Sequence, residues 1–152
     1  MNTPADKPIE ICDHVFLGNF NAAVYSNLLA DKITSVVCLT EFSQDYKDYI
    51  DTANKIKLLH INNISEDLSE SSFTIDKLKK AVDFIEKEIK QNHNVLVHCK
   101  AGYSRSPTVV IAYLMRKNNW TTNQAISFVE KRAPHINPTY HNLLEEFYRQ
   151  LL

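Results

Sequence analysis

The stretch VLVHCKAGYSRSPT, residues 95–108, places a cysteine, a glycine and an arginine between two apolar segments. The apolar residues at its start are typical of a buried strand, and residues 107–117 are typical of a buried helix. A loop that joins a strand to the start of a helix can direct consecutive backbone N–H groups towards one point, where the helix N-terminus adds partial positive charge. The stretch therefore predicts an anion-binding loop between a buried strand and a buried helix.

The polar residues of this loop suit an anion site. Gly102 allows the backbone to curl, and Pro107 in the first helical turn gives up only an N–H group that has no partner within the helix. Arg105 supplies a planar fork that can bind two phosphate oxygens. The positive field of the loop would favour the thiolate form of Cys99, and Ser106 could hydrogen-bond its sulfur. A buried cysteine in a strand is the commoner structural interpretation, but these neighbours favour a nucleophile.

Strands and helices alternate along the chain. Apolar runs predict five strands, at residues 9–12, 15–17, 35–39, 57–61 and 94–97. Helical periodicity and helix-start residues predict five helices, at residues 21–30, 74–91, 107–117, 121–132 and 137–152. This order implies an α/β fold, with a central, mainly parallel sheet flanked by helices on both faces.

The last two helices carry their own start signals. Thr121 and Gln124 have the spacing of a capping box, while Asn137 and Pro138 suit an N-cap and the first helical position. Asn137 could instead brace the anion-binding loop.

A second loop, residues 62–72, should lie beside the first. Ligands of parallel sheets bind beyond the carboxyl ends of the strands, and both loops leave strands at that edge and are joined by one crossover helix. The second loop contains Glu66, Asp67 and Glu70, and a carboxylic acid there could protonate a leaving group bound in the first loop.

The segment HCKAGYSRSPT resembles the HC-x5-R signature of the cysteine-based protein phosphatases, and its AGxSRS form is similar to that of the small dual-specificity phosphatases. Residues 15–18 (VFLG), the apolar run that ends at Met115 and the helical tail are also similar to that family, so the resemblance covers nearly the whole chain. It implies a cysteine-phosphatase-like fold. It also implies that Cys99 attacks phosphorus and that Ser106 assists breakdown of the thiophosphate intermediate.

The resemblance assigns the rest of the site as well. The phosphoryl oxygens would be held by the loop residues Lys100, Ala101, Gly102, Tyr103, Ser104 and Arg105. His98 would orient the loop and tune the thiolate, although a satisfied core histidine is the alternative. The family places an aspartate at about the position of Asp67, which would protonate the leaving group and then deprotonate water; a solvated loop carboxylate is the alternative. Glu66 and Glu70 are expected to be solvated.

The residues around the cysteine bear on the substrate. Tyr103 could line the entrance and stack on a phosphotyrosine ring, or pack on the surface. Some inositol-lipid phosphatases also carry a lysine at the position of Lys100. Those enzymes tend to have a second basic residue at the position of Tyr103, and its absence here favours phosphorylated proteins as substrates. The expected reaction is hydrolysis of phosphotyrosine and phosphoserine or phosphothreonine. The alternatives are a phosphate-binding pseudophosphatase or interaction module, and a phosphatase acting on phosphoinositide or on RNA 5′-phosphate.

Composition limits the other classes. A chain of 152 residues suits one catalytic domain, residues 1–152, with about residues 1–8 as a flexible N-terminal tail. The net charge of −1 argues against a nucleic-acid or membrane partner, and no apolar run approaches the roughly 18 residues that span a membrane. The histidines lack acid or cysteine partners at zinc spacing, so no metal and no cofactor are expected.

Three widely separated cysteines suit a reducing compartment, and hence the cytoplasm or the nucleus. They also raise a redox hypothesis, in which Cys12 or Cys38 traps an oxidised Cys99 as a disulfide. The oligomeric state has no sequence signal.

Overall fold

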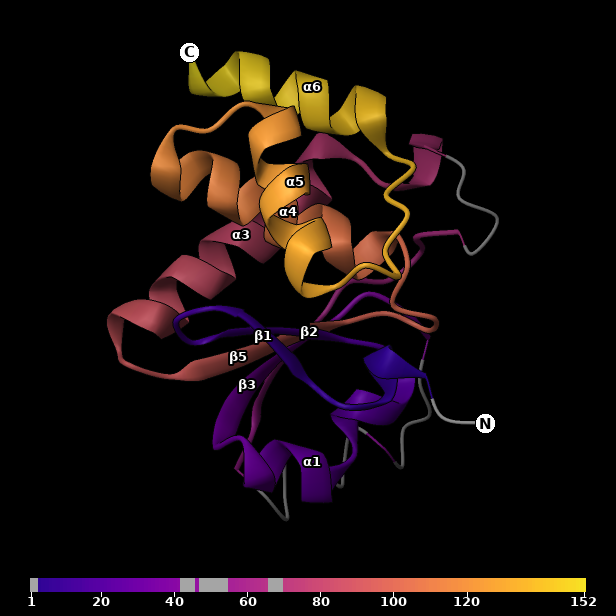
Figure 1. Cartoon of the computed structure of the whole chain (residues 1–152), viewed down its shortest axis with the longest axis vertical. Coiled ribbons are helices and arrows are strands. Elements are labelled where there is room, and N and C mark those ends of the chain that lie inside the picture. The colour runs from indigo at the N-terminus through magenta and orange to yellow at the C-terminus, as the bar shows by residue number, and fades with distance from the viewer. Residues whose placement is uncertain (1–2, 42–45, 47–54, 66–69) are drawn as a thin grey trace.

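Residue 98 lies at the end of the central strand of a five-stranded sheet in the computed structural model, which describes residues 3–41, 46, 55–65 and 70–152. The strands are β1 (Ile9–Cys12), β2 (Val15–Gly18), β3 (Ile33–Cys38), β4 (Lys57–His60) and β5 (Asn94–His98). Their order in the sheet is β1-β2-β5-β3-β4 (Figure 1). Among the strand pairs in the described part of the chain, only β1–β2 is antiparallel, which confirms the mainly parallel sheet.

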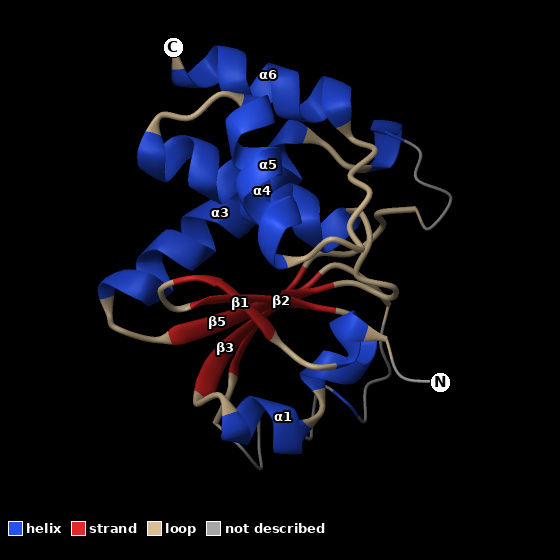
Figure 2. Cartoon of the chain, viewed as in Figure 1, coloured by secondary structure: helices blue, strands red, loops and turns tan. Residues whose placement is uncertain are grey.

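Helices cover both faces of this sheet, as expected, but unevenly. One face carries α3 (Ile75–Lys90), α4 (Arg105–Asn118), α5 (Thr122–Arg132) and α6 (His141–Leu151). The other face carries the short helices η2 (Phe20–Ala23) and α1 (Tyr25–Ala30) (Figures 1 and 2). The chain also forms the 3-10 turns η1 (Pro4–Asp6) and η4 (Glu70–Ser72).

The alternating side chains of the strands supply two apolar layers. In β5, Val95 and Val97 belong to the large core beneath α3–α6, whereas Leu96 belongs to a smaller core with Leu28 of α1. All three β5 side chains are fully buried. A strand buried on both faces reads as a continuous apolar run, which explains why β5 was recognisable in the sequence.

The central helix α4 begins two residues earlier than expected and includes Arg105 in its first turn. Residues 105–115 are all buried, because this helix packs against the sheet on one side and against α3, α5 and α6 on the others. The helix ends at Asn118, and its C-cap residue Asn119 adopts the left-handed conformation with φ 56°. The capping box of Thr121 and Gln124 is confirmed at the start of α5.

Two expected helices are wrong in their extent. The helix expected at residues 21–30 is divided by Val24, whose extended backbone separates η2 from α1; Asn19 caps η2 by accepting hydrogen bonds from the Asn21 and Ala22 N–H groups. The final helix begins at His141, not at Asn137 and Pro138. The Asn137 N–H group donates to Tyr103 O at 2.8 Å, a tertiary bond that holds this residue outside the helix.

The N-terminal residues expected to form a tail make defined contacts from Thr3 onward. Thr3 and Asp6 cap η1 reciprocally, and Ala5 is buried. The Asn19 N–H group donates to Ala5 O at 2.9 Å. Residues 3–6 are therefore bound to the loop that follows β2.

Candidate active site

Cys99 follows β5 at the carboxyl edge of the sheet. β5 lies between two parallel strands, β2 and β3. His98 is paired in register with Gly18 of β2 and with Cys38 of β3. The Leu39 N–H group donates to His98 O at 2.9 Å, which extends the pairing to the last residue of the strand. Three hydrogen-bonded strands therefore fix the position at which Cys99 begins the loop.

Two hydrogen-bonding groups lie close to the sulfur of Cys99. The residue is only 2% exposed, and the Gly102 N–H group donates to its Sγ at 3.3 Å. The Ser106 Oγ lies 3.2 Å from the same sulfur and 3.4 Å from Gly18 O. A hydroxyl and an amide N–H group thus lie within reach of one sulfur, and the loop predicted from the sequence to bind an anion begins at this point.

Gly102 is required by both conformation and space. Its φ of +78° lies in the left-handed region that side chains rarely adopt. A Cβ at this position would lie 3.1 Å from the Ala5 Cβ and 3.3 Å from the Asn19 Cβ. The loop therefore curls at a point where Ala5 and Asn19 pack against its backbone.

Arg105 is buried with its guanidinium held by two backbone carbonyls. Its Nη1 donates to Leu39 O at 3.1 Å and to Ile64 O at 3.4 Å, and the residue is 5% exposed. These carbonyls follow β3 and β4, so the arginine is oriented by both neighbouring strand ends. The bond to Ile64 also brings the described start of the 62–72 loop beside the cysteine loop, as the sheet topology predicted.

A segment before α6 holds the second half of the cysteine loop. The Ser104 Oγ lies 2.9 Å from the Thr139 Oγ1 and accepts from the Thr139 N–H group at 3.0 Å. Asn137 binds Tyr103 O through its backbone N–H group, so this residue braces the loop rather than capping a helix. No sequence pattern pointed to Thr139, because its contact joins residues 35 positions apart.

His98 lies beneath the loop as a neutral side chain. Burial lowers the pKa of His98 to about 4, and its Nδ1 lies 3.4 Å from Cys99 O. Among the described residues its Nε2 has no hydrogen-bond partner. An imidazole that is uncharged at pH 7 adds no positive charge beneath the loop.

Three residues of the cysteine loop reach the surface, namely Lys100, Ala101 and Tyr103. Lys100 is exposed, and its carbonyl accepts from the Phe20 N–H group at 3.2 Å. Tyr103 is 51% exposed, and its ring centroid lies 6.4 Å from that of His135. Its ring therefore contacts His135 in the segment before α6, while about half of the residue is open to solvent.

The candidate acid Asp67, like Glu66, lies outside the described residues. The described flanks of that loop approach each other, since the Ser65 N–H group donates to the Ser72 Oγ at 2.8 Å. Glu70 is the first residue of η4. The structure therefore places Ile64 beside Arg105 and leaves the role of Asp67 as a prediction.

The remaining cysteines occupy different distances from this site. Cys38 is fully buried and paired with His98, next to Cys99, and burial raises its pKa to about 12. Cys12 pairs with Val15, which is in register with Val95 at the opposite end of β5. Only Cys38 belongs to the carboxyl edge of the sheet.

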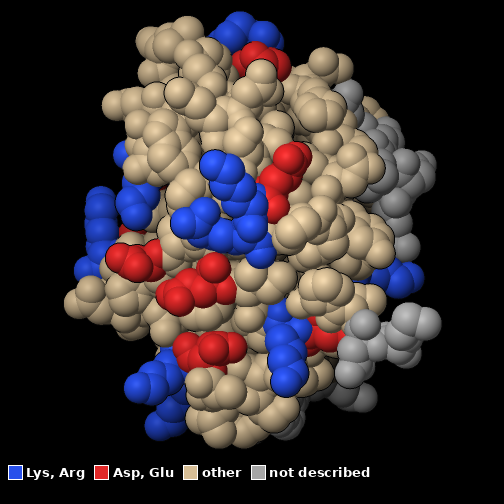
Figure 3. Space-filling model, in the orientation of Figure 1, with Lys and Arg blue, Asp and Glu red and all other residues tan. Residues whose placement is uncertain are grey.

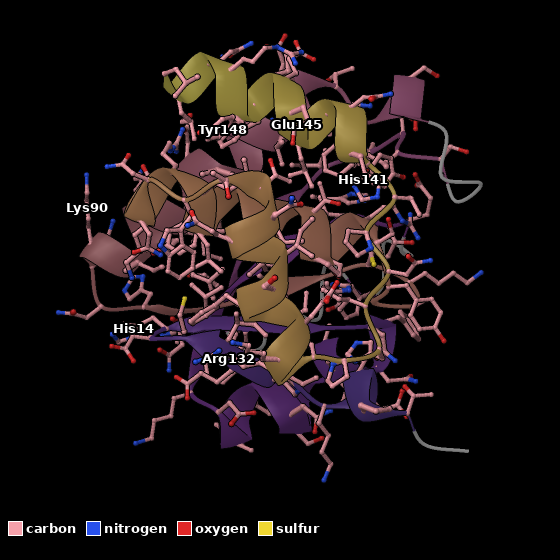
Figure 4. All side chains as sticks on the ribbon, turned by 45° about the horizontal axis from the view of Figure 1, so that its top comes forward. His14, Lys90, Arg132, His141, Glu145 and Tyr148 are labelled. Carbon is pink, nitrogen blue, oxygen red and sulfur yellow. The ribbon has the colours of Figure 1, made fainter. Side chains whose placement is uncertain are left out.

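Charged and metal-binding side chains are dispersed. On the face shown in Figure 3, Lys and Arg alternate with Asp and Glu and form no patch of one sign. His14 and His141 lie far apart (Figure 4), and no group of three or more His, Cys, Asp or Glu in the described ranges could hold a metal. Within the same ranges, no helix is long and apolar enough to cross a membrane.

Comparison with known proteins places this geometry in a family. Residues 15–151 match the family model "Dual specificity phosphatase, catalytic domain". The chain is 38% identical over 133 residues to the provisionally named tyrosine phosphatase 123R of Invertebrate iridescent virus 6, which covers 87% of this chain and 84% of the viral protein. It is 31% identical over 143 residues to dual specificity protein phosphatase 8 of Mus musculus, covering 93% of this chain.

The chain spans only about a fifth, 21%, of that mouse protein. Among solved structures, PTPMT1 in complex with PI(5)P superposes with a TM-score of 0.79 at 25% identity, covering 95% of this chain and 96% of that one. The family model covers most of the chain, including β5, the cysteine loop and α4. The chain therefore belongs to the dual specificity phosphatase family, and it is an enzyme of the protein-tyrosine and dual-specificity phosphatase class.

Proposed function

We propose that this chain hydrolyses phosphotyrosine and phosphoserine or phosphothreonine in proteins through a cysteinyl-phosphate intermediate. The observation that carries the proposal is the placement of the Cys99 Sγ between the Gly102 N–H group and the Ser106 hydroxyl, 3.3 and 3.2 Å away. Both groups can donate to a thiolate, and Arg105 is buried within the same loop. This arrangement supports a nucleophile built into a phosphate-binding loop.

In the first step the Cys99 thiolate attacks phosphorus, an S–P bond forms and the P–O bond to the substrate breaks. The phosphoryl oxygens are bound by the backbone amides of residues 100–105 and by Arg105. A guanidinium carries five N–H donors, and the two bonds made by Nη1 to backbone carbonyls fix its plane. The fork is thus oriented before the substrate arrives, which lowers the cost of reaching the transition state.

Asp67 protonates the departing alkoxide or phenoxide in that step. It then takes a proton from the water that attacks the phosphocysteine, and the S–P bond breaks to release inorganic phosphate. Ser106 donates a hydrogen bond to the departing sulfur. The position of Asp67 three residues after Ile64, whose carbonyl accepts from Arg105, supports this role.

Tyr103 gives the site its preference for an aromatic phosphoester. Its ring is half exposed and belongs to the same loop as the nucleophile. Offset stacking of aromatic rings contributes about 1 kcal/mol beyond burial, enough for a several-fold preference. The ring would contact the phenyl group of phosphotyrosine, and it would make a smaller stabilising contact with the short side chain of phosphothreonine.

Phosphoinositide hydrolysis is the second candidate, because PTPMT1 with PI(5)P bound shares this fold at 25% identity. Lys100 supplies one basic residue in the loop for an inositol ring. Tyr103 stands where a second basic residue would strengthen that interaction, which ranks the lipid substrate below phosphoprotein.

The test compares kcat/KM on a phosphotyrosine peptide, a phosphothreonine peptide, a soluble phosphoinositide and 5′-triphosphorylated RNA. We expect the two peptides to be the better substrates and Cys99→Ser to abolish turnover. Cys12→Ser is the matched control, since this cysteine lies at the other end of the sheet. Faster turnover of the phosphoinositide would favour the second candidate, and phosphate binding without turnover would identify a pseudophosphatase.

A further inference from the structure

The 3-10 turn at residues 3–6 and the loop after β2 form a hydrogen-bonded unit, here called the N-terminal clasp: residues 3–6 with Asn19 and Asn21. Asp6 is its centre. Its Oδ1 accepts from the Asn19 Nδ2 at 2.7 Å and from the Asn21 Nδ2 at 3.1 Å, while its Oδ2 accepts from the Thr3 N–H group at 2.7 Å. The hydrogen bonds from Asn19, Thr3 and Asn21 hold the pKa of Asp6 well below its usual range. The centre of the clasp is therefore an anion with several donors.

The N-terminal clasp contacts the cysteine loop directly, and Phe20, which lies between its members Asn19 and Asn21, makes a second contact. A Cβ on Gly102 would lie 3.1 Å from the Ala5 Cβ and 3.3 Å from the Asn19 Cβ, so the glycine backbone packs directly on it. Next to Asn19, the Phe20 N–H group donates to Lys100 O at 3.2 Å. The clasp thus holds residues 100–102, whereas residues 137–139 hold residues 103 and 104.

Gly102 links these contacts to the reacting sulfur. Its N–H group is the one that donates to the Cys99 Sγ. If the clasp loosens, the peptide units of residues 100–102 lose their support on that side, and their N–H groups no longer converge as well on a bound phosphate. Displacements of about 1 Å in a catalytic site can reduce rates by about 100-fold.

We propose that Asp6 is a positioning residue for phosphate binding, acting through Asn19 and Phe20 on the cysteine loop. The inference rests on the proposed function, because it concerns the same loop. Asp6 precedes the part of the chain that matches the family model, residues 15–151, so the family assignment does not supply this role. Asn19 has a second role as the cap of η2 through its Oδ1, and the Nδ2 is the atom that binds Asp6.

Three variants separate the Asp6–Asn19 bond from general folding. Asp6→Ala removes the acceptor. Asn19→Asp keeps the Oδ1 that caps η2, replaces the donor and sets a second carboxylate against Asp6. The double variant Asp6→Asn with Asn19→Asp reverses the pair and allows the hydrogen bond to form again. Lys7→Ala is the matched control, because Lys7 is exposed and adjacent to Asp6.

Each variant is measured for kcat and KM on p-nitrophenyl phosphate, the inhibition constant of inorganic phosphate and the midpoint of thermal unfolding. A second assay measures how well inorganic phosphate protects Cys99 from alkylation by iodoacetate. We expect both single substitutions to raise the phosphate inhibition constant and KM by about tenfold. The reversed pair should restore most of the affinity, and Lys7→Ala should stay within about twofold.

The outcomes distinguish this inference from the proposed function. An unchanged phosphate inhibition constant in Asp6→Ala overturns the positioning role, whatever happens to the unfolding midpoint. Failure of the reversed pair to restore affinity also overturns it. If the unmodified protein does not turn over substrate but phosphate protects Cys99, weaker protection in the single variants supports the inference while hydrolysis is rejected. No protection of the unmodified protein by phosphate rejects both.

Discussion

Three structural constraints act on Gly102. It has a positive φ, a Cβ on it would make tight contacts with Ala5 and Asn19 at 3.1 and 3.3 Å, and its N–H group donates to the Cys99 sulfur. The sequence indicated that a glycine was needed for the loop to curl. It gave no sign of the N-terminal residues that fill the space around it, because contacts between residues 5 and 102 have no local pattern.

Gly102→Ala should impair catalysis more than it impairs folding. The backbone strain and the close contacts act directly on the peptide unit that binds the sulfur. We expect kcat/KM on p-nitrophenyl phosphate to fall by about 100-fold, with a loss of roughly 1–2 kcal/mol in the free energy of unfolding. Steady-state kinetics and urea unfolding measure the two effects. Normal kinetics in the variant would mean that the loop does not depend on this conformation.

Asp67→Asn should lower kcat in a way that depends on the leaving group. An amide cannot donate a proton to the departing oxygen, so substrates with poor leaving groups, such as phosphothreonine peptides, should lose about 100-fold or more in kcat. A substrate with a good leaving group, such as p-nitrophenyl phosphate, should lose less in the first step. Glu70→Gln is the control from the same loop. Equal losses on all substrates, or a larger loss in the control, would move the acid role to another residue.

At the residue scale the sequence predicted the components that belong to one short motif. Cys99, Gly102 and Ser106 meet in the structure as expected, and Arg105 is buried beside them. Asn19 and Thr139 were not predicted, because they act through tertiary contacts with residues far away in the chain. The local motif encodes the chemistry, whereas its supports are visible only once the chain is folded.

At the scale of elements, α3 is fixed to the sheet by a buried carboxylate. Glu88, near the end of this helix, has a fully buried side chain that accepts from the Ser35 Oγ at 2.6 Å, the Lys57 Nζ at 3.0 Å and the His93 Nδ1 at 3.0 Å. Burial raises the pKa of Glu88, but hydrogen bonds from Ser35, His93 and Lys57 outweigh it and lower the pKa to about 2. The cluster joins α3 to β3, β4 and the turn before β5.

Glu88→Gln should reduce stability at neutral pH and remove part of its pH dependence. The folded-state pKa lies below the ordinary value of 4.5, so the stabilisation is complete above about pH 4.5 and is lost as the pH falls towards 2. We expect a loss of about 2 kcal/mol in the free energy of unfolding at pH 7, shrinking as the pH is lowered through that range. Urea unfolding at several pH values measures it. An equal difference at pH 3 and pH 7 would contradict the assignment. Glu130→Gln, at an exposed position of α5, serves as control.

Cys38 lies at the C-terminal end of β3, paired with the residue that precedes Cys99. The redox hypothesis therefore reduces to Cys38 as the partner of Cys99. Cys12 is paired near Val95, roughly 13 Å along β5 from Cys99, too far for a disulfide, which needs Cα atoms within about 7 Å. Hydrogen peroxide would convert the Cys99 thiolate to a sulfenic acid, and the Cys38 thiol would attack that sulfur and release water. We expect a Cys38–Cys99 disulfide in mass spectra and thiol-reversible inactivation. Cys38→Ser should recover less activity with thiols, and Cys12→Ser should recover like the unmodified protein.

The boundaries of helices and strands were predicted less well than their presence. The strands and the long helices were placed within one or two residues, since their apolar periodicity reflects burial in the two cores. The start of α6 was misplaced because Asn137 and Pro138 are also suited to an extended segment, and the bond from Asn137 to Tyr103 decides between the two. A tertiary hydrogen bond overrode a local helix signal.

At the scale of the whole molecule, the sheet collects the site from separate parts of the chain. The ends of β2, β3 and β5 meet at one edge, and Arg105 reaches the residues that follow β3 and β4. The thick helical layer beneath buries α4, so the first turn of that helix is a fixed support for the loop. The α/β class and the mainly parallel sheet followed from the order of elements, whereas the uneven covering of the two faces required the structure.

The proposed mechanism requires that the phosphoryl group pass through a covalent bond to the sulfur of Cys99. The most direct measurement is mass spectrometry of protein mixed with p-nitrophenyl phosphate and quenched in acid during turnover. We predict one phosphoryl group, located on Cys99, that disappears when substrate is exhausted and does not form in Cys99→Ser. Turnover without a phosphoryl group on Cys99, or turnover that survives Cys99→Ser, would contradict the account.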